Sequence, residues 1–249
     1  MAATKHPVAI VTGAGSGIGR AVALELDRRG CVQVLAGRRM DALRETGQML
    51  SGAWLAKRCD VADPSECDRL VEETAHEFGR VDVLVNNAGD APLAPIAKHT
   101  PDVIKRTFEI NALGPAYLIA AFWRVLERQI AGERGADASV RGPCIVNVSS
   151  MASLDPFPGF FAYAAAKSAL NSMVRSCHKE GQALGVRCFG VAPGAVETEM
   201  LRGLFTEAAI PREVTLRPED VARVVGECVA GDRDEEAGTT IPVRAGVAG

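Results

Sequence analysis

The chain has 249 residues, of which 47% are hydrophobic and 24% are charged, and its formal net charge is −3. A globular chain of this length buries roughly 70–75% of its unfolded surface and needs no metal or disulfide to stay folded. The small negative charge and an aromatic content of 5% exclude binding to nucleic acid or to an anionic membrane, because these functions need basic or stacking surfaces.

The seven cysteines are widely spaced, with no C-x-x-C pair and no histidine at metal-ligand spacing. This pattern is typical of reduced thiols in a cytoplasmic protein, so we predict neither a disulfide framework nor a metal site. The first residues lack the apolar segment of a secretory signal, and the longest apolar stretch, Ile110–Trp123, is too short to span a membrane. We therefore expect a cytoplasmic protein that crosses no membrane.

Short apolar runs alternate with amphipathic segments in the first third of the chain. The runs predict strands, and the segments with apolar residues at helical spacing predict helices. The third helix has the clearest start, because Asp63 is followed by a proline in the first turn and by Glu66 three residues on. The predicted strands are Val8–Thr12, Val32–Ala36, Trp54–Cys59 and Val81–Val85, and the predicted helices are Gly17–Arg29, Met40–Leu50 and the segment from Asp63 to Gly79.

The same alternation continues to the end of the chain. A long helical region runs from Thr100 through Arg128 with a break near Gly114-Pro115, and a polar stretch, Ala131–Gly142, is predicted to be a surface loop. The remaining strands are predicted at Ile145–Val148, Val186–Val191 and Thr239–Val243, separated by helices Phe161–Leu184 and Arg217–Ala230. This pattern predicts one α/β domain over residues 1–249, a Rossmann-like doubly wound parallel sheet of about seven strands with helices on both faces.

A glycine-rich turn, Thr12–Gly19, lies where the first strand becomes the first helix. Glycines let the backbone turn sharply and approach a pyrophosphate, and the helix N-terminus offers free N–H groups to that anion. The spacing is T-G-x-x-x-G-x-G and not the general G-x-G-x-x-G of dinucleotide-binding domains. We interpret it as a dinucleotide site and not as a tight turn without a ligand, with candidate contacts at Gly13, Gly15, Ser16, Gly17, Ile18 and Gly19.

Two arginines follow the second predicted strand, where a dinucleotide-binding domain usually presents an acid to the ribose hydroxyls. An acid repels a 2′-phosphate, whereas a guanidinium pairs with it through two hydrogen bonds. Arg38 and Arg39 therefore favour NADP(H) as the cofactor. The alternative is that the two arginines belong to a solvent-exposed helix start and contact no cofactor, in which case NAD(H) could be the cofactor instead.

Further polar residues surround the start of the predicted helix Phe161–Leu184. Tyr163 and Lys167 are four residues apart on one helix face, and Ser149 and Ser150 end the preceding strand, where open α/β sheets place ligands. A free tyrosine, with a pKa near 10, is a poor base at neutral pH. A lysine about 4 Å from the phenol is predicted to lower that pKa toward the useful range.

These motifs resemble those of the short-chain dehydrogenase/reductase family, in its short single-domain branch, and the resemblance covers nearly the whole chain. In that family Asn87, Ala88 and Gly89 line the adenosine ribose, and the segment Pro193–Thr198 holds the nicotinamide carboxamide. Besides the glycine turn, the matching positions are the adenine-contacting acid Asp60 with Val61, the Asn-Asn-Ala-Gly motif ending in Asn87, Ala88 and Gly89, the helix asparagine Asn111, the serine Ser150, the Tyr-x-x-x-Lys pair Tyr163 and Lys167, and Pro193, Gly194, Val196 and Thr198.

The resemblance implies an oxidoreductase that moves a hydride between NADP(H) or NAD(H) and a small carbonyl or secondary alcohol substrate. In the family mechanism Tyr163 transfers a proton to or from the substrate oxygen, and Ser150 orients that oxygen. Lys167 binds the nicotinamide ribose and lowers the pKa of Tyr163, and Asn111 supports a water that relays protons. The resemblance also implies a substrate lid around residues 195–215 and a homotetramer or homodimer. The chain lacks the Asp-Gly-Gly segment with which many members end, a departure that concerns contacts across the oligomer.

Two other functions stay open at this point. A 3-oxoacyl-carrier-protein reductase would favour a basic patch for its acidic partner, of which Arg202 and Arg212 are the only hint. A non-catalytic dinucleotide-binding regulator or scaffold belongs to another class, and the four intact catalytic positions argue against it.

The sequence does not name a substrate. Phe157, Phe160 and Phe161 are equally consistent with packing and with an apolar substrate wall. Asp155 and Arg202 are consistent with solvated charges or with polar contacts to a substrate.

Overall fold

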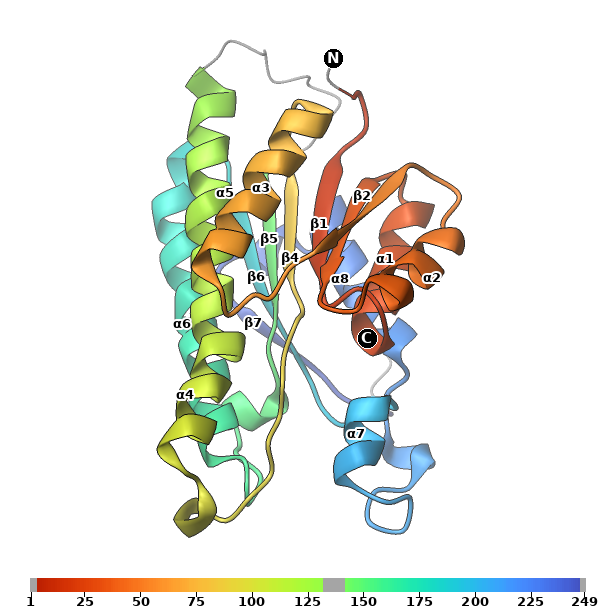
Figure 1. Cartoon of the computed structure of the whole chain (residues 1–249), viewed down its shortest axis with the longest axis vertical. Helices are drawn as coiled ribbons and strands as arrows, with labels where there is room; N and C mark the ends of the chain where they lie inside the picture. Colours follow the sequence, from red (N-terminus) through yellow and green to blue (C-terminus); the bar gives the residue numbers. More distant parts are fainter. Residues whose placement is uncertain (1–3, 132–141, 247–249) are drawn as a thin grey trace.

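The computed structural model describes residues 4–131 and 142–246, and its centre is a sheet of seven parallel strands in the order β3-β2-β1-β4-β5-β6-β7 (Figure 1). Most of the predicted loop at 131–142 lies outside the described residues, as do the last three residues of the chain. The strands are β1 (Val8–Thr12), β2 (Val32–Gly37), β3 (Trp54–Arg58), β4 (Val83–Asn86), β5 (Cys144–Val148), β6 (Arg187–Pro193) and β7 (Thr240–Val243).

Helices cover both faces of this sheet, as the sequence predicts for a doubly wound fold. One face is covered by α1, α2 and α8, and the other by α3, α5 and α6 (Figure 1). The α-helices are α1 (Gly17–Arg28), α2 (Met40–Gln48), α3 (Pro64–Phe78), α4 (Pro101–Phe108), α5 (Gly114–Ala131), α6 (Phe161–Gly181), α7 (Glu199–Leu204) and α8 (Pro218–Ala230).

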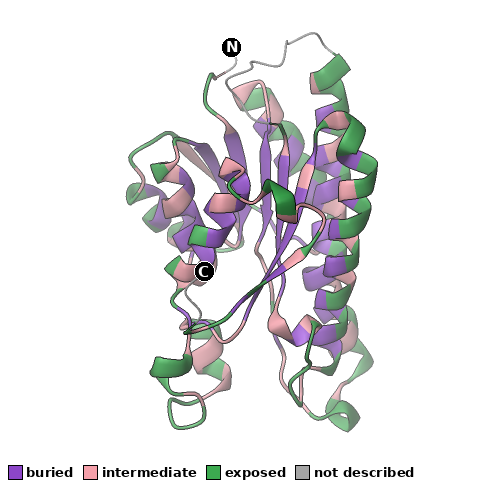
Figure 2. Ribbon diagram, turned by 180° about the vertical axis from the view of Figure 1, so that it is seen from behind, coloured by how far each residue is buried: buried purple, intermediate pink, exposed green. Residues whose placement is uncertain are grey.

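The strands are buried on both sides, so their side chains divide between two cores (Figure 2). Ile10 pairs in register with Leu84 on β4, and both point into the core under α3 and α5. Val11 and Val85, one residue further along, point into the core under α1 and α8. This alternation explains why the strands appear in the sequence as continuous apolar runs.

Local signals in the sequence place several helix ends correctly. Asp63 accepts hydrogen bonds from the Ser65 and Glu66 amides at the start of α3, at 2.8 and 3.3 Å, with Pro64 in the first turn. Gly79 ends that helix with a left-handed φ of 76°. The other predicted elements are present, with ends that differ by up to three residues.

The predicted break near Gly114-Pro115 is misplaced. The interruption is a π-helical turn, Glu109–Leu113, between α4 and α5, and Pro115 belongs to the first turn of α5. The side-chain amide of Asn111 donates to the Thr107 carbonyl at 2.9 Å, the group to which its own N–H would bond in a regular α-helix. A polar side chain, and not the proline, therefore marks the break.

The carboxyl ends of β1 and β4 meet at the point where the chain changes direction across the sheet, where open α/β sheets bind ligands. Among the described residues, no helix is long and apolar enough to cross a membrane.

Candidate active site

A cavity of about 680 Å³ opens at the carboxyl ends of the strands and runs from the glycine turn before α1 to α7. Every residue predicted for the site lines it except Asn111. The predicted residues that it brings together are Gly13, Gly15, Ser16, Gly17, Ile18, Gly19, Arg38, Arg39, Asp60, Val61, Asn87, Ala88, Gly89, Ser150, Tyr163, Lys167, Pro193, Gly194, Val196 and Thr198.

The glycine turn is packed so closely that larger residues do not fit in it. A Cβ added to Gly19 would lie 2.2 Å from the Gly13 carbonyl oxygen, and Gly13 itself has a left-handed φ of 67°. The Asn87 side chain donates to the Thr12 carbonyl at 2.9 Å, and the Thr12 hydroxyl accepts from the Asn87 and Ala88 amides at 3.0 Å each. The motif after β4 therefore holds the turn after β1 in place.

The start of α1 is suited to an anion. Ser16 is the N-cap residue in extended backbone, but its hydroxyl makes no capping hydrogen bond to the helix. The first N–H groups of α1 are therefore without a side-chain acceptor at the wall of the cavity. This cradle of glycines and open N–H groups fits the pyrophosphate of a dinucleotide.

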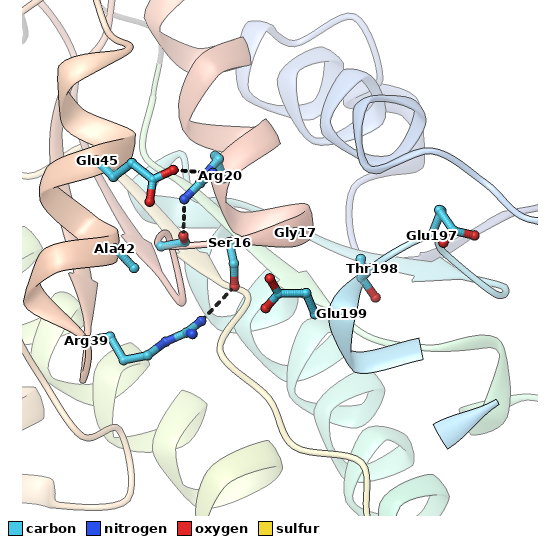
Figure 3. Close-up of a pocket in the computed structure, with 10 residues that line it drawn as sticks. Ser16, Gly17, Arg20, Arg39, Ala42, Glu45, Glu197, Thr198 and Glu199 are labelled. Atoms are coloured by element: carbon cyan, nitrogen blue, oxygen red, sulfur yellow. Dashed lines mark hydrogen bonds and ion pairs between the residues drawn. The ribbon is translucent and has the colours of Figure 1, made fainter. Parts of the chain in front are cut away.

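A smaller hollow beside this turn, of about 320 Å³, contains Arg39 (Figure 3). Arg20 in this hollow already has partners within the protein, an ion pair with Glu45 at 3.0 Å and a hydrogen bond to the Gly15 carbonyl at 2.8 Å. Among the described residues, Arg39 donates to the Ser16 hydroxyl alone, at 3.1 Å. Within the described part of the chain, neither Arg38 nor Arg39 forms an ion pair, so both guanidinium groups remain available to a phosphate.

Asp60, the predicted adenine contact, is held by a residue that the sequence analysis missed. Burial acts to raise the pKa of its carboxyl, but hydrogen bonds from Arg106 and the Ala62 amide outweigh burial and hold that pKa below its usual value. Arg106 lies 2.9 Å from the carboxylate and 46 residues away in the chain, so no local pattern could have identified it.

The predicted catalytic residues come from the end of β5 and the first turns of α6. The Ser150 hydroxyl accepts a hydrogen bond from the Ala152 amide at 3.2 Å, which fixes it at the start of a short 3₁₀ turn. Lys167 is buried, and its Nζ donates to the Val148 carbonyl at 2.8 Å. The same Nζ lies 5.8 Å from the centre of the Tyr163 ring.

The predicted effect of the lysine on the tyrosine is wrong for the protein without cofactor. Burial raises the pKa of Tyr163, although a hydrogen bond with Ser150 acts to lower it. Burial also lowers the pKa of Lys167, to about 8. The reason is geometric, because the ammonium group is directed at a backbone carbonyl and both side chains have lost water.

Asn111 lies behind the cavity wall. Its side-chain nitrogen donates to the Asp90 carbonyl at 2.8 Å, and its oxygen accepts from the Asp90 amide at 3.3 Å. A Cβ built on Gly89 would stand 3.0 Å from the Asn111 side-chain oxygen and 3.6 Å from the Lys167 Nζ. Glycine at this position therefore keeps clear the space between the two polar groups.

The segment after β6 closes the far side of the cavity. Thr198 caps α7 by accepting from the Leu201 amide at 3.2 Å, and its methyl group would lie 3.2 Å from a Cβ on Gly17. The sequence analysis expected a lid here but not a helix. A threonine cap followed by Glu199 is the signal that could have predicted it.

The sequence leaves open whether several residues near Tyr163 pack internally or face a substrate, and the structure separates them by whether they line the cavity. Phe157, Phe160 and Asp155 line the cavity, together with Phe205 from the end of α7, which the sequence analysis missed. Phe161 does not line it and packs edge-on against His99, with ring centres 5.9 Å apart.

A doubly wound sheet with a glycine turn at its switch point, and a tyrosine, lysine and serine on the same cavity, defines a dinucleotide-dependent oxidoreductase. The chain belongs to the short chain dehydrogenase family, which it matches over residues 7–209. It is thus an NAD(P)-dependent dehydrogenase or reductase acting on small molecules.

The relatives support this class. An uncharacterized oxidoreductase of Staphylococcus epidermidis is 30% identical over 203 residues, covering 82% of this chain and 84% of the relative. The 11-beta-hydroxysteroid dehydrogenase A of Arachis hypogaea is 33% identical over 230 residues, which cover 89% of this chain and 62% of the longer plant protein. The crystal structure of levodione reductase has the same fold, with a TM-score of 0.85, 22% identity and 96% coverage of both chains.

Proposed function

We propose that the protein transfers a hydride between NADPH and a carbonyl compound, or between NADP and the corresponding secondary alcohol, with Tyr163 as the general acid and base. One observation carries this proposal. Tyr163 and Ser150 line the same cavity that reaches the glycine turn, where Ser150 acts to lower the pKa of the tyrosine, and the Lys167 ammonium group is buried beside them. A proton donor and a cofactor cradle thus share one cavity.

The reduced nicotinamide, when bound, supplies the hydride, and its oxidised form carries a positive charge that favours the phenolate. In reduction, the Ser150 hydroxyl donates to the carbonyl oxygen and orients it. Tyr163 then gives its proton to that oxygen as negative charge develops there, so that one hydride and one proton convert the carbonyl into an alcohol. Lys167 binds the ribose beside the nicotinamide, and Asn111 supports a water that restores the proton of Tyr163.

The preference for NADP(H) rests on the two arginines after β2. Neither guanidinium group forms an ion pair in the described chain, although the charge of Arg38 acts on the Asp60 carboxylate, and Arg39 lies over the start of α1, where the adenosine end of the cofactor would lie. A 2′-phosphate there would be bound by planar, permanently charged groups. NAD(H) has a neutral 2′-hydroxyl at this position and therefore no charge there for them to pair with.

Replacing Tyr163 tests the reaction. Tyr163→Phe should lower kcat by about 10²–10⁴-fold, the usual contribution of a positioned acid or base, while cofactor affinity stays within a factor of two or three. The chain has only one other tyrosine, so Tyr117→Phe is the matched control and should be nearly silent. Turnover by Tyr163→Phe at the level of the control would refute the mechanism.

A fluorescence titration with NADPH and NADH side by side tests the cofactor preference. Tighter binding of NADPH is expected, and Arg38→Asp should weaken NADPH by about 10-fold or more and leave NADH nearly unchanged. Arg175→Asp, an exposed change of equal charge on α6, should leave both affinities as they are. Wild-type protein that binds NADH more tightly would contradict the proposal, and binding of either cofactor without turnover of any carbonyl would favour the scaffold function.

A carrier-protein reductase receives no support from the candidate basic patch. Arg202 pairs with Glu197 at 2.5 Å, and Arg212 pairs with both Glu197 and Glu207. These guanidinium groups are neutralised within the chain, so an acidic partner would have to displace internal ion pairs to use them.

For the assembly and its setting, we propose a single domain over residues 1–249 that forms a homotetramer or homodimer in the cytoplasm, with residues 195–215 as the substrate lid. Family resemblance supports the assembly, and sedimentation of the purified protein tests it. A monomer at micromolar concentration would contradict it.

A further inference from the structure

The end of the cavity beyond Tyr163 is a continuous aromatic wall. The Tyr163 and Phe160 rings are 5.2 Å apart between centres, and Phe160 lies 6.3 Å from Phe205. Phe205 in turn meets Phe157 edge-on at 5.7 Å and 89°. The wall therefore joins the segment before α6 to the end of α7, in the geometry that aromatic pairs prefer.

This wall is not covered by the protein itself. Phe157 is 54% exposed and Met200, which lines the same cavity, is 48% exposed. Large apolar side chains that face a cavity instead of the core are surfaces for a ligand to cover. A ligand whose oxygen meets Tyr163 would place its carbon frame against these rings.

The charges around the cavity are unevenly distributed. Its basic lining residues are Arg38, Arg39 and Lys167, all in positions that serve the cofactor or the proton transfer. At the aromatic end the ionisable lining residues are acidic.

Asp155 belongs to the loop that carries Phe157 and Phe160. Asp90 begins the segment packed against that loop, where the Ala94 amide donates to the Gly159 carbonyl at 3.1 Å. Arg202 on α7 is not among the lining residues, because it is paired with Glu197 and donates to the Ile210 carbonyl at 2.8 Å. In the described chain, the lining cation nearest to the aromatic end is Lys167, which is buried, donates to the Val148 carbonyl at 2.8 Å and lies on the cofactor side of Tyr163, so the rings beyond Tyr163 have no cation of their own to receive an anionic substrate.

Resting on the proposed carbonyl chemistry, we infer that the substrate is an uncharged carbonyl compound, or its alcohol, with an aryl or similarly flat apolar ring next to the reacting carbon. The ring packs on Phe160 and Phe205 while the oxygen meets Ser150 and Tyr163. Carboxylates and phosphates of the same shape are disfavoured by Asp155 and Asp90, since an anion would lose its water without gaining a cation.

A pair of aryl ketones that differ at the para substituent, one neutral and one anionic, tests the inference, namely 4-methylacetophenone and 4-acetylbenzoate, each with NADPH. The neutral ketone should have a kcat/KM about tenfold or more above the carboxylate. Asp155→Asn should reduce this ratio of kcat/KM values about three- to fivefold, as expected for the loss of a partly screened charge.

Phe205→Ala should raise KM for the neutral ketone about tenfold with little change in kcat, because it removes apolar contact and not the proton donor. Phe161→Ala is the control, since this phenylalanine follows the same loop but lies outside the cavity lining. An effect of Phe205→Ala no larger than that of the control would overturn the inference.

A binding measurement tests the substrate class independently of the proposed reaction. Calorimetric titration of both ketones into the Tyr163→Phe protein with NADPH should give tighter binding of the neutral compound. If that preference holds while the wild-type protein reduces neither compound, the proposed reaction fails and the substrate class stands. Equal binding of the two, preference for the carboxylate, or binding of neither overturns the substrate class.

Discussion

Lys167 is a basic residue in a place that disfavours charge. Its side chain is 4% exposed and has one hydrogen bond to a backbone carbonyl, and burial brings its pKa down to about 8. At neutral pH the folded protein therefore holds a desolvated ammonium group without a carboxylate beside it. A residue kept for its chemistry is expected to cost stability in this way.

Removing this charge should stabilise the protein without cofactor. In the unfolded chain the lysine keeps its ordinary pKa of 10.5, so below pH 8 the full penalty is present, and it is relieved as pH rises from 8 to 10.5 because only the unfolded state still binds the proton. Lys167→Met should raise the free energy of unfolding at pH 7 by about 1–3 kcal/mol, and the difference should shrink toward pH 10.

Urea unfolding followed by circular dichroism at several pH values measures this effect. Lys179→Met, an exposed change on the same helix, should have almost no effect at any of them. A Lys167→Met protein less stable than wild type at pH 7, or a difference that does not depend on pH, would show that the buried charge is not the cause.

The sequence pattern selects residues that share one cavity, but it does not reveal their partners. Ser150, Tyr163 and Lys167 follow from spacing along one strand and one helix. The hydrogen bond between Lys167 and the Val148 carbonyl depends on how α6 rests on β5, and the Arg106–Asp60 pair joins positions 46 residues apart. Such contacts are set by tertiary packing, which local patterns do not encode.

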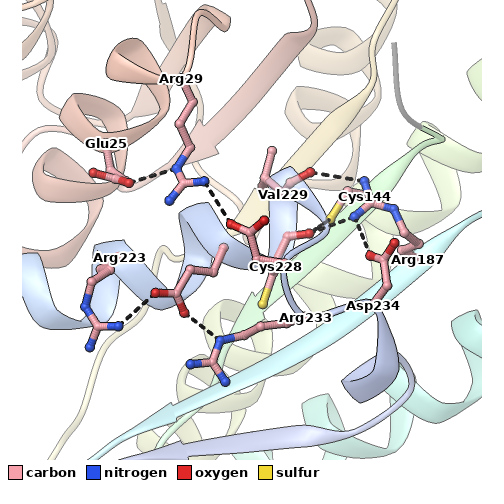
Figure 4. Close-up of polar contacts among 11 residues, drawn as sticks. Glu25, Arg29, Cys144, Arg187, Arg223, Cys228, Val229, Arg233 and Asp234 are labelled. Atoms are coloured by element: carbon pink, nitrogen blue, oxygen red, sulfur yellow. Dashed lines mark hydrogen bonds and ion pairs between the residues drawn. The ribbon is translucent and has the colours of Figure 1, made fainter. Parts of the chain in front are cut away.

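At the scale of elements, the end of α8 is held by a single arginine (Figure 4). Arg187 on β6 donates to the Cys228 carbonyl at 2.7 Å and to the Val229 carbonyl at 3.1 Å. It also pairs with Asp234 at 3.0 Å, and its side chain is only 13% exposed. One planar group thus satisfies the last carbonyls of a helix and ties it to the sheet.

Replacing this arginine should destabilise the fold far more than a surface change would. Arg187→Met should lower the free energy of unfolding by about 2–4 kcal/mol, because the Val229 carbonyl loses its side-chain donor, the Cys228 carbonyl keeps only the longer contacts from the Gly231 amide and the Cys144 thiol, and the ion pair with Asp234 is lost. Arg223→Met breaks an exposed pair with Glu227 one turn apart and should cost less than about 0.5 kcal/mol. Chemical denaturation of the two variants compares them directly, and equal losses would mean that Arg187 contributes no more than a surface charge.

Elements with strong local signals were predicted, and those without them were not. The acid cap, proline and closing glycine of α3 specify its ends by short-range chemistry. The π-helical turn depends on one side chain competing for a backbone carbonyl, and α7 has only six residues, too few for a helical period to be visible. The sheet itself could be predicted, because burial on both faces makes its central strands apolar runs, whereas the edge strand β3 is only partly buried and ends in Lys57 and Arg58.

At the scale of the whole molecule, the cavity gathers residues from nearly the full length of the chain, from Gly13 to Ile210. A cofactor bound there would contact both halves of the sheet. Unfolding should therefore be one cooperative transition that shifts as a unit when ligand binds.

Scanning calorimetry checks this expectation. NADPH at about 100 times its Kd should add about 2.7 kcal/mol and raise Tm by roughly 5–10 °C, whereas NADH at the same concentration should raise it less. In the Arg38→Asp protein, the increases of Tm caused by NADPH and by NADH should become similar. Two transitions, only one of which responds to NADPH, would contradict a single domain.

The pairing of β1 with β4 also bears on how activity is acquired during folding. The hydrogen bonds that fix the glycine turn join Thr12 to Asn87, 75 positions further on, and the two strands are parallel neighbours at the centre of the sheet. Contacts so distant along the chain form only after the entropy of closing a large loop has been overcome, and sheets of this kind fold slowly. Newly made chains therefore acquire the cofactor site late, and recovery of NADPH binding during refolding reports closure of the central sheet and not the earlier formation of helices.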